Sequence, residues 1–244
     1  MGKYVDEIQD RLRQEGYPLF NRHEVTQLTI PGPDQSGKSA QPQINQQTSW
    51  LLDNNDQTGG FILGPSNITY QTTNYDTHKE FIAELLRGLR AVHDVVKLDH
   101  VRRLGLRYLD AVMPQDGEKL EQYLVDGLHG LNFHAERQFA MAESVFSTRV
   151  EPIIDEGTLV VRVYTRSNER LGFPPDLNPH RLVMNPKFDM EIPRDHAVID
   201  TDHYSTGRMP MDWEDLEQQL LSLHQQVSDA FNAAATNHAR TSWA

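Results

Sequence analysis

The 244-residue sequence contains no cysteine, which excludes disulfides, zinc sites built on thiolates and a cysteine nucleophile. It also contains no apolar run near the ~20 residues that a membrane-spanning helix needs. The first residues, MGKYVDEIQDRL, are charged and lack the apolar segment of a signal peptide. We therefore expect a cytoplasmic protein that has no contact with a membrane.

Positive charge is scarce, because 23 lysines and arginines stand against 35 aspartates and glutamates, which gives a formal net charge of −12. A broad nucleic-acid-binding surface needs lysine and arginine to neutralise phosphates, so this composition disfavours nucleic acid as a partner. The acidity fits either simple solubility or a basic protein partner. A hydrophobic fraction of 38% is sufficient for a substantial core.

Hydrophobic periodicity predicts a mixture of helices and strands. Apolar residues at helical spacing predict helices at residues 4–14, 77–96, 118–131 and 213–236. Alternation and turn signals predict strands at residues 24–30, 49–54, 60–63, 67–73, 101–112, 137–150, 158–165 and 197–204. Hairpin-length connections dominate, so we expect an α+β fold. It would be a single domain over residues 1–244, with one mostly antiparallel sheet, two long helices packed on one face, and the strand at 101–112 in its centre.

A polar loop is expected at residues 31–47, and it contains the most suggestive motif of the chain. Gly32, Gly37, Lys38 and Ser39 match the phosphate-binding pattern G-x-x-x-x-G-K-S. That pattern binds phosphate only if a helix begins at the lysine, whereas AQPQINQQTSW follows here and contains a proline and no apolar stripe. We favour a surface loop over a nucleotide site and expect no cofactor. A second irregular stretch, rich in proline, is expected at residues 166–195.

Charged residues on two predicted strands are the other candidates for a site. Asp200 and Asp202 lie on one face of a strand, where they could bind a divalent cation, and the alternative is that they pair with arginines. Arg103 and Arg107 also share a strand face, on either side of Gly105. They could bind an anion or the carboxylates of a partner, and the alternative is salt bridges within the sheet.

Four segments carry a family resemblance: SWLLDNN with GGFILGPSNITYQTTNY, then RRLGLRYLDAV, AVIDTDHY and LLSLHQQVSDAFNAAAT. Over residues 45–236 the sequence resembles a sporadically distributed family of uncharacterised bacterial proteins of similar size. That family shares a GLRY strand, an ID-x-D strand and a C-terminal helix with an LH…F pattern. Its patchy distribution resembles that of genes on mobile elements and in phage-defence islands. The resemblance implies no established reaction. Relatives have an extra N-terminal strand before the first helix, so the resemblance implies that the sheet here either lacks this edge strand or gains one from a partner.

Two functions remain open at this point. The absence of a coherent catalytic set favours a non-enzymatic protein-binding or assembly module, an accessory component of a defence or mobile-element system. It would act as a homodimer or with a different protein, and the apolar stripe of the last helix and Trp243 would help to form the interface. The alternative is a metal- or nucleotide-phosphate-dependent enzyme that uses the Gly32–Ser39 loop or the pair Asp200 and Asp202.

Overall fold

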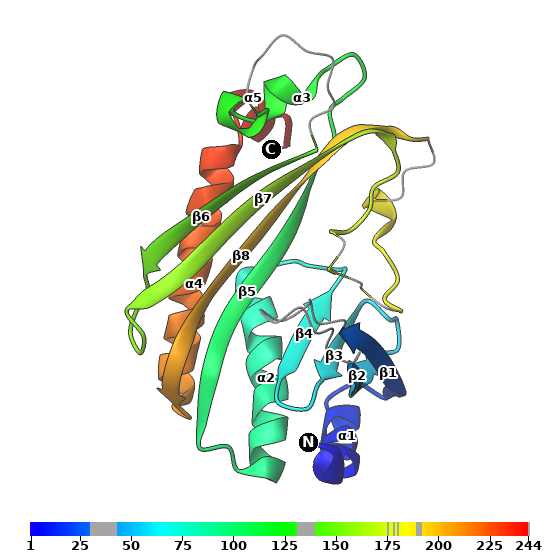
Figure 1. Ribbon diagram of the computed structural model, residues 1–244, viewed down its shortest axis with the longest axis vertical. Coiled ribbons are helices and arrows are strands. Elements are labelled where there is room, and N and C mark those ends of the chain that lie inside the picture. The colour runs from blue at the N-terminus through cyan, green and yellow to red at the C-terminus, as the bar shows by residue number, and fades with distance from the viewer. Residues whose placement is uncertain are drawn as a thin grey trace, which may run out of the picture. The chain divides into compact units, whose positions relative to one another are not determined.

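The chain divides into two compact units in the computed structural model (Figure 1). The structure describes residues 1–29, 43–130, 140–174, 176–177, 179, 181–188 and 192–243. Unit 1 comprises Met1–Lys97 and Pro179–Asn185, and unit 2 comprises Leu98–Asn178 and Pro186–Ala244. The predicted α+β class with antiparallel strands is confirmed. None of the described helices is long and apolar enough to cross a membrane.

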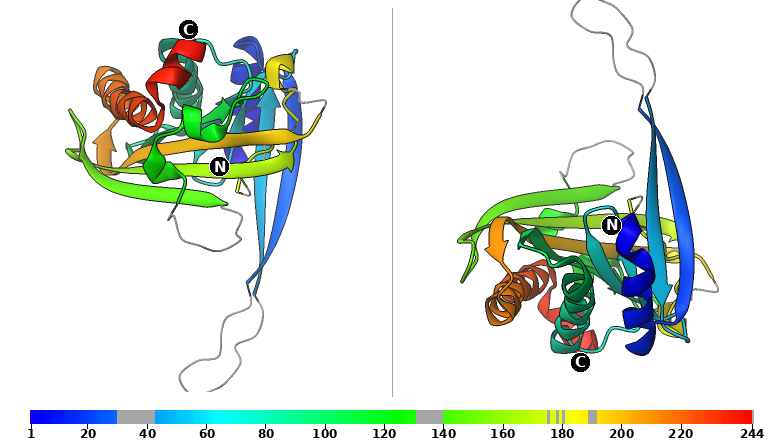
Figure 2. Two further views of the ribbon diagram at one scale, coloured as in Figure 1. Left: turned by 90° about the horizontal axis from the view of Figure 1, so that it is seen from above. Right: turned by 90° about the horizontal axis from the view of Figure 1, so that it is seen from below.

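Unit 1 consists of a four-stranded antiparallel sheet, called sheet A, with two helices. Its elements are η1 (Gly2–Tyr4), α1 (Val5–Gln14), β1 (Leu19–Thr29), β2 (Gln43–Asp53), β3 (Gly59–Leu63), β4 (Ile68–Thr72) and α2 (His78–Val96). Each strand pairs with the next in the chain, in the order β1-β2-β3-β4. Figure 2 shows β1 and β2 as a long two-stranded ribbon.

Helix α2 begins where the sequence predicts, because the Thr77 side chain accepts a hydrogen bond from the backbone N–H of Glu80 (3.3 Å). Its apolar stripe packs against α1 and β4. Gly88 lies against the ring of Phe61, and a Cβ at this position would overlap that ring. The absence of a side chain at Gly88 therefore allows α2 to pack closely on sheet A at this turn.

Unit 2 consists of a second antiparallel sheet, called sheet B, with one long helix. Its elements are β5 (His100–Val112), α3 (Leu120–Tyr123), η2 (Asp126–Leu128), β6 (Met141–Arg149), β7 (Glu156–Glu169), η3 (Pro186–Phe188), β8 (Arg194–Pro210), α4 (Trp213–Ala234) and α5 (Asn237–Trp243). The strand order is β5-β8-β7-β6. Helix α4 packs on β8, β5 and β7, and it buries the stripe Leu216, Leu220, Leu223 and Val227.

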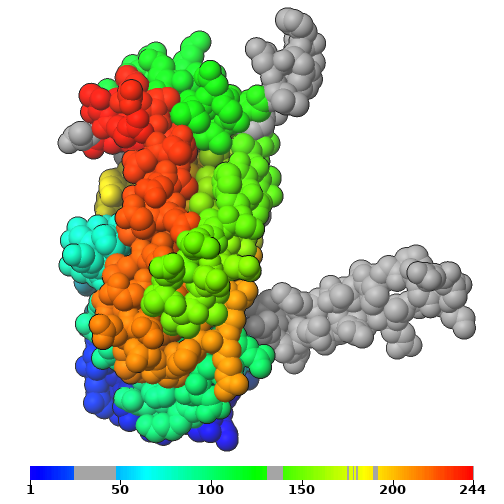
Figure 3. Space-filling model, turned by 90° about the vertical axis from the view of Figure 1, so that its left-hand side faces the viewer, coloured from blue at the N-terminus to red at the C-terminus, as the bar shows by residue number. Residues whose placement is uncertain are grey.

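Polar side chains on α4 also hold the loop between β6 and β7. Gln219 is fully buried, and its Oε1 accepts from the backbone N–H groups of Ile153 (2.8 Å) and Ile154 (3.3 Å). Its Nε2 donates to the carbonyl of Ile154 (3.0 Å). In Figure 3 the end of this hairpin lies against α4. The helix thus fixes the position of the β6–β7 hairpin through buried hydrogen bonds as well as apolar contacts.

Two features of the predicted sheet are wrong. The strands form two four-stranded sheets instead of one, and each long helix packs on the sheet of its own unit. The strand β5, expected in the centre, lies at an edge of sheet B, and β7 and β8 lie in the middle. The physical reason lies in the side chains of β5. Arg102 and Arg103 are exposed, and exposed charges are better accommodated in an edge strand than in a strand with neighbours on both sides.

Two further segments differ from the predictions, and a third lies outside the described residues. Among its described residues the stretch 118–131 forms only α3 and η2 instead of one helix, because Leu124 and Val125 adopt extended backbone and Leu124 pairs with Ala235. Gly130, beyond η2, adopts a positive φ of 76°. Gln43–Gln47, expected in the polar loop, extend β2, where Gln43 pairs with Thr29. Gly32, Gly37, Lys38 and Ser39 lie outside the described residues.

The proline-rich stretch is shorter than expected, because β7 continues to Glu169 and β8 begins at Arg194. Part of it belongs to unit 1, where the Val183 N–H donates to the carbonyl of Gln57 (2.7 Å). The interface role expected for Trp243 stays a prediction, since the residue is 39% exposed but also packs within its own unit. Its ring lies 5.9 Å from that of Tyr123 and 5.8 Å from that of Phe231, within unit 2.

Candidate functional site

The charged candidates of the sequence meet on one face of sheet B, the face opposite α4. In β8, Asp200 and Asp202 are two residues apart and therefore point the same way, and Arg107 of β5 stands opposite Asp202 in the ladder. Their neighbours Ile199 and Thr201 point toward the helix face. Strand alternation thus brings residues that are about ninety positions apart in sequence into one polar cluster.

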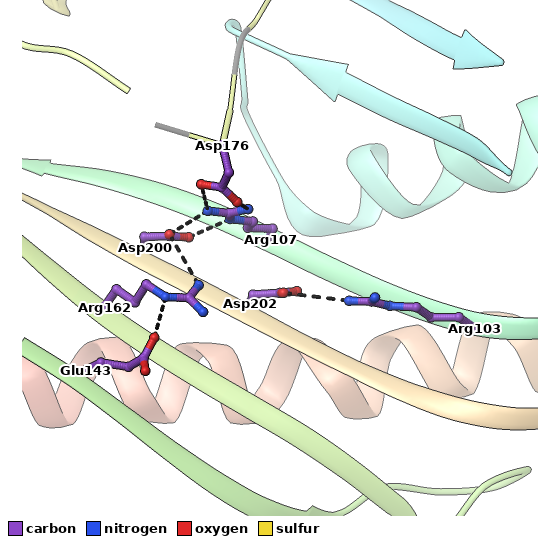
Figure 4. Close-up of polar contacts among 7 residues, drawn as sticks. All are labelled: Arg103, Arg107, Glu143, Arg162, Asp176, Asp200 and Asp202. Atoms are coloured by element: carbon purple, nitrogen blue, oxygen red, sulfur yellow. Dashed lines mark hydrogen bonds and ion pairs between the residues drawn. The ribbon is translucent and has the colours of Figure 1, made fainter. Parts of the chain in front are cut away.

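Asp200 is the centre of this cluster, and its side chain is 0% exposed (Figure 4). Arg107 binds it through two parallel hydrogen bonds, Nε to Oδ1 (2.7 Å) and Nη2 to Oδ2 (2.7 Å). The remaining donors of Arg107 bind Asp176, at 2.7 and 3.1 Å. A guanidinium that holds two carboxylates in this planar geometry is fully occupied by this chain.

The network continues across β7 to the edge strand β6. Arg162 Nη1 lies 3.8 Å from Asp200 Oδ2, and Arg162 Nε donates to Glu143 Oε2 (2.6 Å). Burial alone would lower the pKa of Arg107, but its hydrogen bonds to Asp200 and Asp176 outweigh this effect and raise the pKa. The same bond to Arg107 lowers the pKa of Asp176. Both shifts favour the charged forms of Arg107 and Asp176.

Arg103 and Asp202 form a looser pair beside this network. Their nearest charged atoms are 3.7 Å apart. The Arg103 guanidinium stacks on the ring of Tyr204, 3.9 Å from its centroid, and remains largely exposed. The pKa of Asp202 is raised, chiefly by burial. Of the two candidate arginines, Arg103 therefore offers more of its surface to solvent.

In this arrangement Asp200 and Asp202 pair with arginines, which is the alternative to a cation site that the sequence left open. The acidic oxygens face arginines, which are poor neighbours for a divalent cation. Among the described residues, no group of three or more histidine, aspartate or glutamate side chains is arranged to hold a metal ion. In chemical terms the cluster joins all four strands of sheet B and the segment that carries Asp176 electrostatically.

A buried histidine and a partly buried aspartate lie on the opposite face, toward α4. His203 Nδ1 lies 2.9 Å from the carbonyl of Leu223, and its Nε2 lies 2.8 Å from Thr148 Oγ1. A carbonyl only accepts, so Nδ1 carries the hydrogen and Nε2 accepts from the hydroxyl. Burial lowers the pKa of His203, which keeps it neutral. Burial also raises the pKa of Asp110, on β5, to about 6.

An open hollow of about 450 Å³ lies where the β6–β7 hairpin meets β8. Its lining is polar and comprises Ser147, Thr148, Arg149, Asp155, Glu156, Gly157, Thr158, Tyr204 and Thr206. Gly157 is required there, because a Cβ would crowd Val150 and Thr148. The mixture of both charge signs with hydroxyl groups gives the hollow no single chemical preference.

The edge strand β6 was not singled out from the sequence. Val145 is 60% exposed, Phe146 50% and Met141 44%, and among the described residues β6 pairs only with β7. The sequence does contain a signal for this exposure. Val145 and Phe146 are adjacent and therefore point to opposite faces of the sheet, and only one of these faces can pack against the helix. The strand therefore offers apolar side chains next to unused backbone groups.

Unit 2 thus presents two contrasting surfaces. The charges around Asp200 are satisfied within the chain, and the edge of β6 is not. The open edge indicates an interface more directly than the charged cluster indicates a reaction. No protein-family model, curated protein or solved structure matches this chain.

Proposed function

We propose that this protein is a non-enzymatic protein-binding module that recognises its partner by adding a strand to the edge of β6. The open edge is the observation that carries the proposal. β6 runs for nine residues in continuous register with β7 and contains no proline. Its charged residues Glu143 and Arg149 lie toward the two ends, and the five residues between them are uncharged. Strand addition uses backbone hydrogen bonds for affinity and flanking apolar side chains for specificity.

The other three edges carry features that discourage such pairing. β4 has only five residues, and β5 has a register shift between Val101 and Arg103 and exposes arginines. In β1, Arg22 and Glu24 form an exposed ion pair. Short length, bulges and charge are the usual means by which an edge avoids a partner. The role that we propose is assembly, as an accessory component of a bacterial defence or mobile-element system.

The test compares Val145→Lys with Val183→Lys, an exposed valine of unit 1 that serves as a matched control. Tagged wild type and both variants are expressed in the native host, and the proteins that co-purify are identified. A lysine on the edge should abolish the complex that wild type and Val183→Lys retain. The identified partner is then purified, and its affinity for the three proteins is measured. Equal affinity for Val145→Lys would contradict the proposal.

The enzyme alternative has its own measurement. A ligand that binds the native state raises the melting temperature. Melting curves are recorded with and without Mg·ATP, Mg²⁺ and Mn²⁺, for wild type and for Lys38→Ala. We expect no shift in either protein. A shift with Mg·ATP that Lys38→Ala removes would favour a nucleotide-dependent enzyme instead.

A further inference from the structure

We propose that the strand that β6 binds is β6 of a second copy, in an antiparallel two-fold pair centred on Phe146. This inference rests on the proposed function and names its partner. It follows from three properties of the strand: which backbone groups point outward, how its charges are spaced, and which side chain would lie on the symmetry axis.

The outward backbone groups follow from the ladder between β6 and β7. The N–H of Thr165 donates to the carbonyl of Ala140 (3.0 Å), and the N–H of Val150 donates to the carbonyl of Asp155 (3.2 Å). Antiparallel pairs alternate between bonded and non-bonded, so the even-numbered residues of β6 direct their N–H and C=O groups toward β7. The groups that face the open edge belong to the odd-numbered residues Met141, Glu143, Val145, Ser147 and Arg149. The Arg149 carbonyl already accepts from Gln226 Nε2 of α4, which leaves it one lone pair for a second strand.

A two-fold pair must bring these odd-numbered residues opposite one another. Any axis that passes through a residue does so, whereas an axis between two residues would place outward groups opposite inward ones. In the register centred on Phe146, Val145 faces Ser147 of the second copy, and Glu143 faces Arg149 of the second copy. By symmetry each of these pairs occurs twice.

The charges select this register over its neighbours. Glu143 bonds Arg162 through Oε2, which leaves Oε1 to accept from another donor. Arg149 is exposed and forms no ion pair with any described residue. An axis through Val145 would place Glu143 opposite Ser147 and Met141 opposite Arg149, with no pairing of charge. Opposite charges across a strand pair stabilise it, and only the axis at Phe146 aligns them.

The side chain on the axis fits the same register. Phe146 would form a non-hydrogen-bonded pair with itself, the type in which Cα atoms approach to about 4.5 Å and side chains are closest. Its ring is half exposed in the single chain, and the second ring would cover it. An exposed aromatic residue that becomes buried at the centre of a small interface is typical of association sites.

The first experiment uses the absence of cysteine from the chain. Val145→Cys, Phe146→Cys and Ser147→Cys are each oxidised under mild conditions and run on a non-reducing gel. Only the residue on the axis meets its own copy within the Cα separation of about 4.4–6.8 Å that a disulfide tolerates. We expect the covalent dimer to form predominantly from Phe146→Cys. Predominant dimer from either neighbour, or equal yields from all three, would overturn the proposed register.

The second experiment exchanges the charges. Light scattering of the wild type at 1–200 μM should approach a mass of twice 28.0 kDa. Arg149→Glu alone and Glu143→Arg alone each create two repulsive pairs and should weaken dimerisation at least about tenfold. Mixing the two variants restores both attractive pairs, so a heterodimer should form. Melting temperatures of the single variants verify that both remain folded.

The outcomes separate this inference from the proposed function. A wild-type mass that stays near 28.0 kDa, or a mixture of the two variants that does not associate, overturns the two-fold pair. The proposed function is overturned only if Val145→Lys also binds every partner as well as wild type does. A monomer whose partner is lost on Val145→Lys would show that β6 binds a different protein.

Discussion

The carboxyl group of Asp110 leads to a stability prediction that can be worked out in full. Asp110 lies on β5, two residues from Tyr108, whose ring contacts His224 of α4, so strand alternation directs Asp110 toward the helix as well. Burial raises its pKa from 3.8 to about 6. An acid with a raised pKa binds its proton more tightly in the folded state. The stability that it contributes is present at low pH and is lost as the pH rises from 3.8 through about 6.

The magnitude follows from that difference in pKa. Each pKa unit corresponds to about 1.4 kcal/mol, so ionisation of Asp110 should cost the folded state about 3 kcal/mol at pH 8 and about 1 kcal/mol at pH 4.5. Asp110→Asn has nearly the same shape and does not titrate. The free energy of unfolding of the variant relative to wild type should therefore rise by about 2 kcal/mol between pH 4.5 and pH 8. Any cost of burying the amide is the same at both pH values and cancels in this comparison.

Urea unfolding of wild type and Asp110→Asn at the two pH values measures this change. Asp116→Asn, at an exposed carboxylate of the same unit, is the matched control for removing one negative charge from an acidic chain. The control should change stability by less than about 0.5 kcal/mol at either pH. If Asp110→Asn alters the free energy of unfolding equally at pH 4.5 and pH 8, burial does not hold the Asp110 proton and the reasoning fails.

Three further substitutions test the packing, each by urea unfolding. Gly88→Ala should destabilise by about 1–3 kcal/mol although alanine favours helices, because its methyl group meets the ring of Phe61, and a gain in stability would contradict this close approach. Asp200→Asn should cost about 3–5 kcal/mol, since it leaves Arg107 without its buried partner, and a loss below about 1 kcal/mol would show that the pair is not strongly coupled. Leu106→Ala should cost about 2–5 kcal/mol, because Leu106 is fully packed, and an unchanged midpoint would refute that.

Local chemistry was predictable from the sequence. Thr77 and Asp212 are residue types that favour N-caps, and both accept backbone hydrogen bonds there; the periodic stripes predict α2 and α4 to within two residues. These features depend on side chains within one or two turns of each other. The β6–β7 hairpin was predictable for the same reason, because its two strands are joined by a short turn.

Long-range pairing was not predictable. β5 pairs with β8 across about ninety residues, and nothing in either strand specifies the other. The division into two sheets depends on such choices, since hairpin signals are equally compatible with one large sheet. The ion pairs around Asp200 could not be predicted in full from the sequence for the same reason. Arg107 and Asp200 could be recognised as candidates, whereas Asp176 and Glu143 join them only through the fold.

A strand edge that pairs with another edge can also propagate into fibres, so the proposed dimer must explain why assembly stops. The two-fold pair uses the same edge in both copies, which leaves none of β6 for a third chain. The opposite edge of sheet B is β5, where the register shift near Val101 and the exposed Arg102 and Arg103 oppose pairing. We therefore expect the mass from light scattering to reach a plateau at two chains and to rise no further between 50 and about 500 μM. A mass that continues to increase with concentration would show that another edge or face associates, and that β6 does not close the assembly.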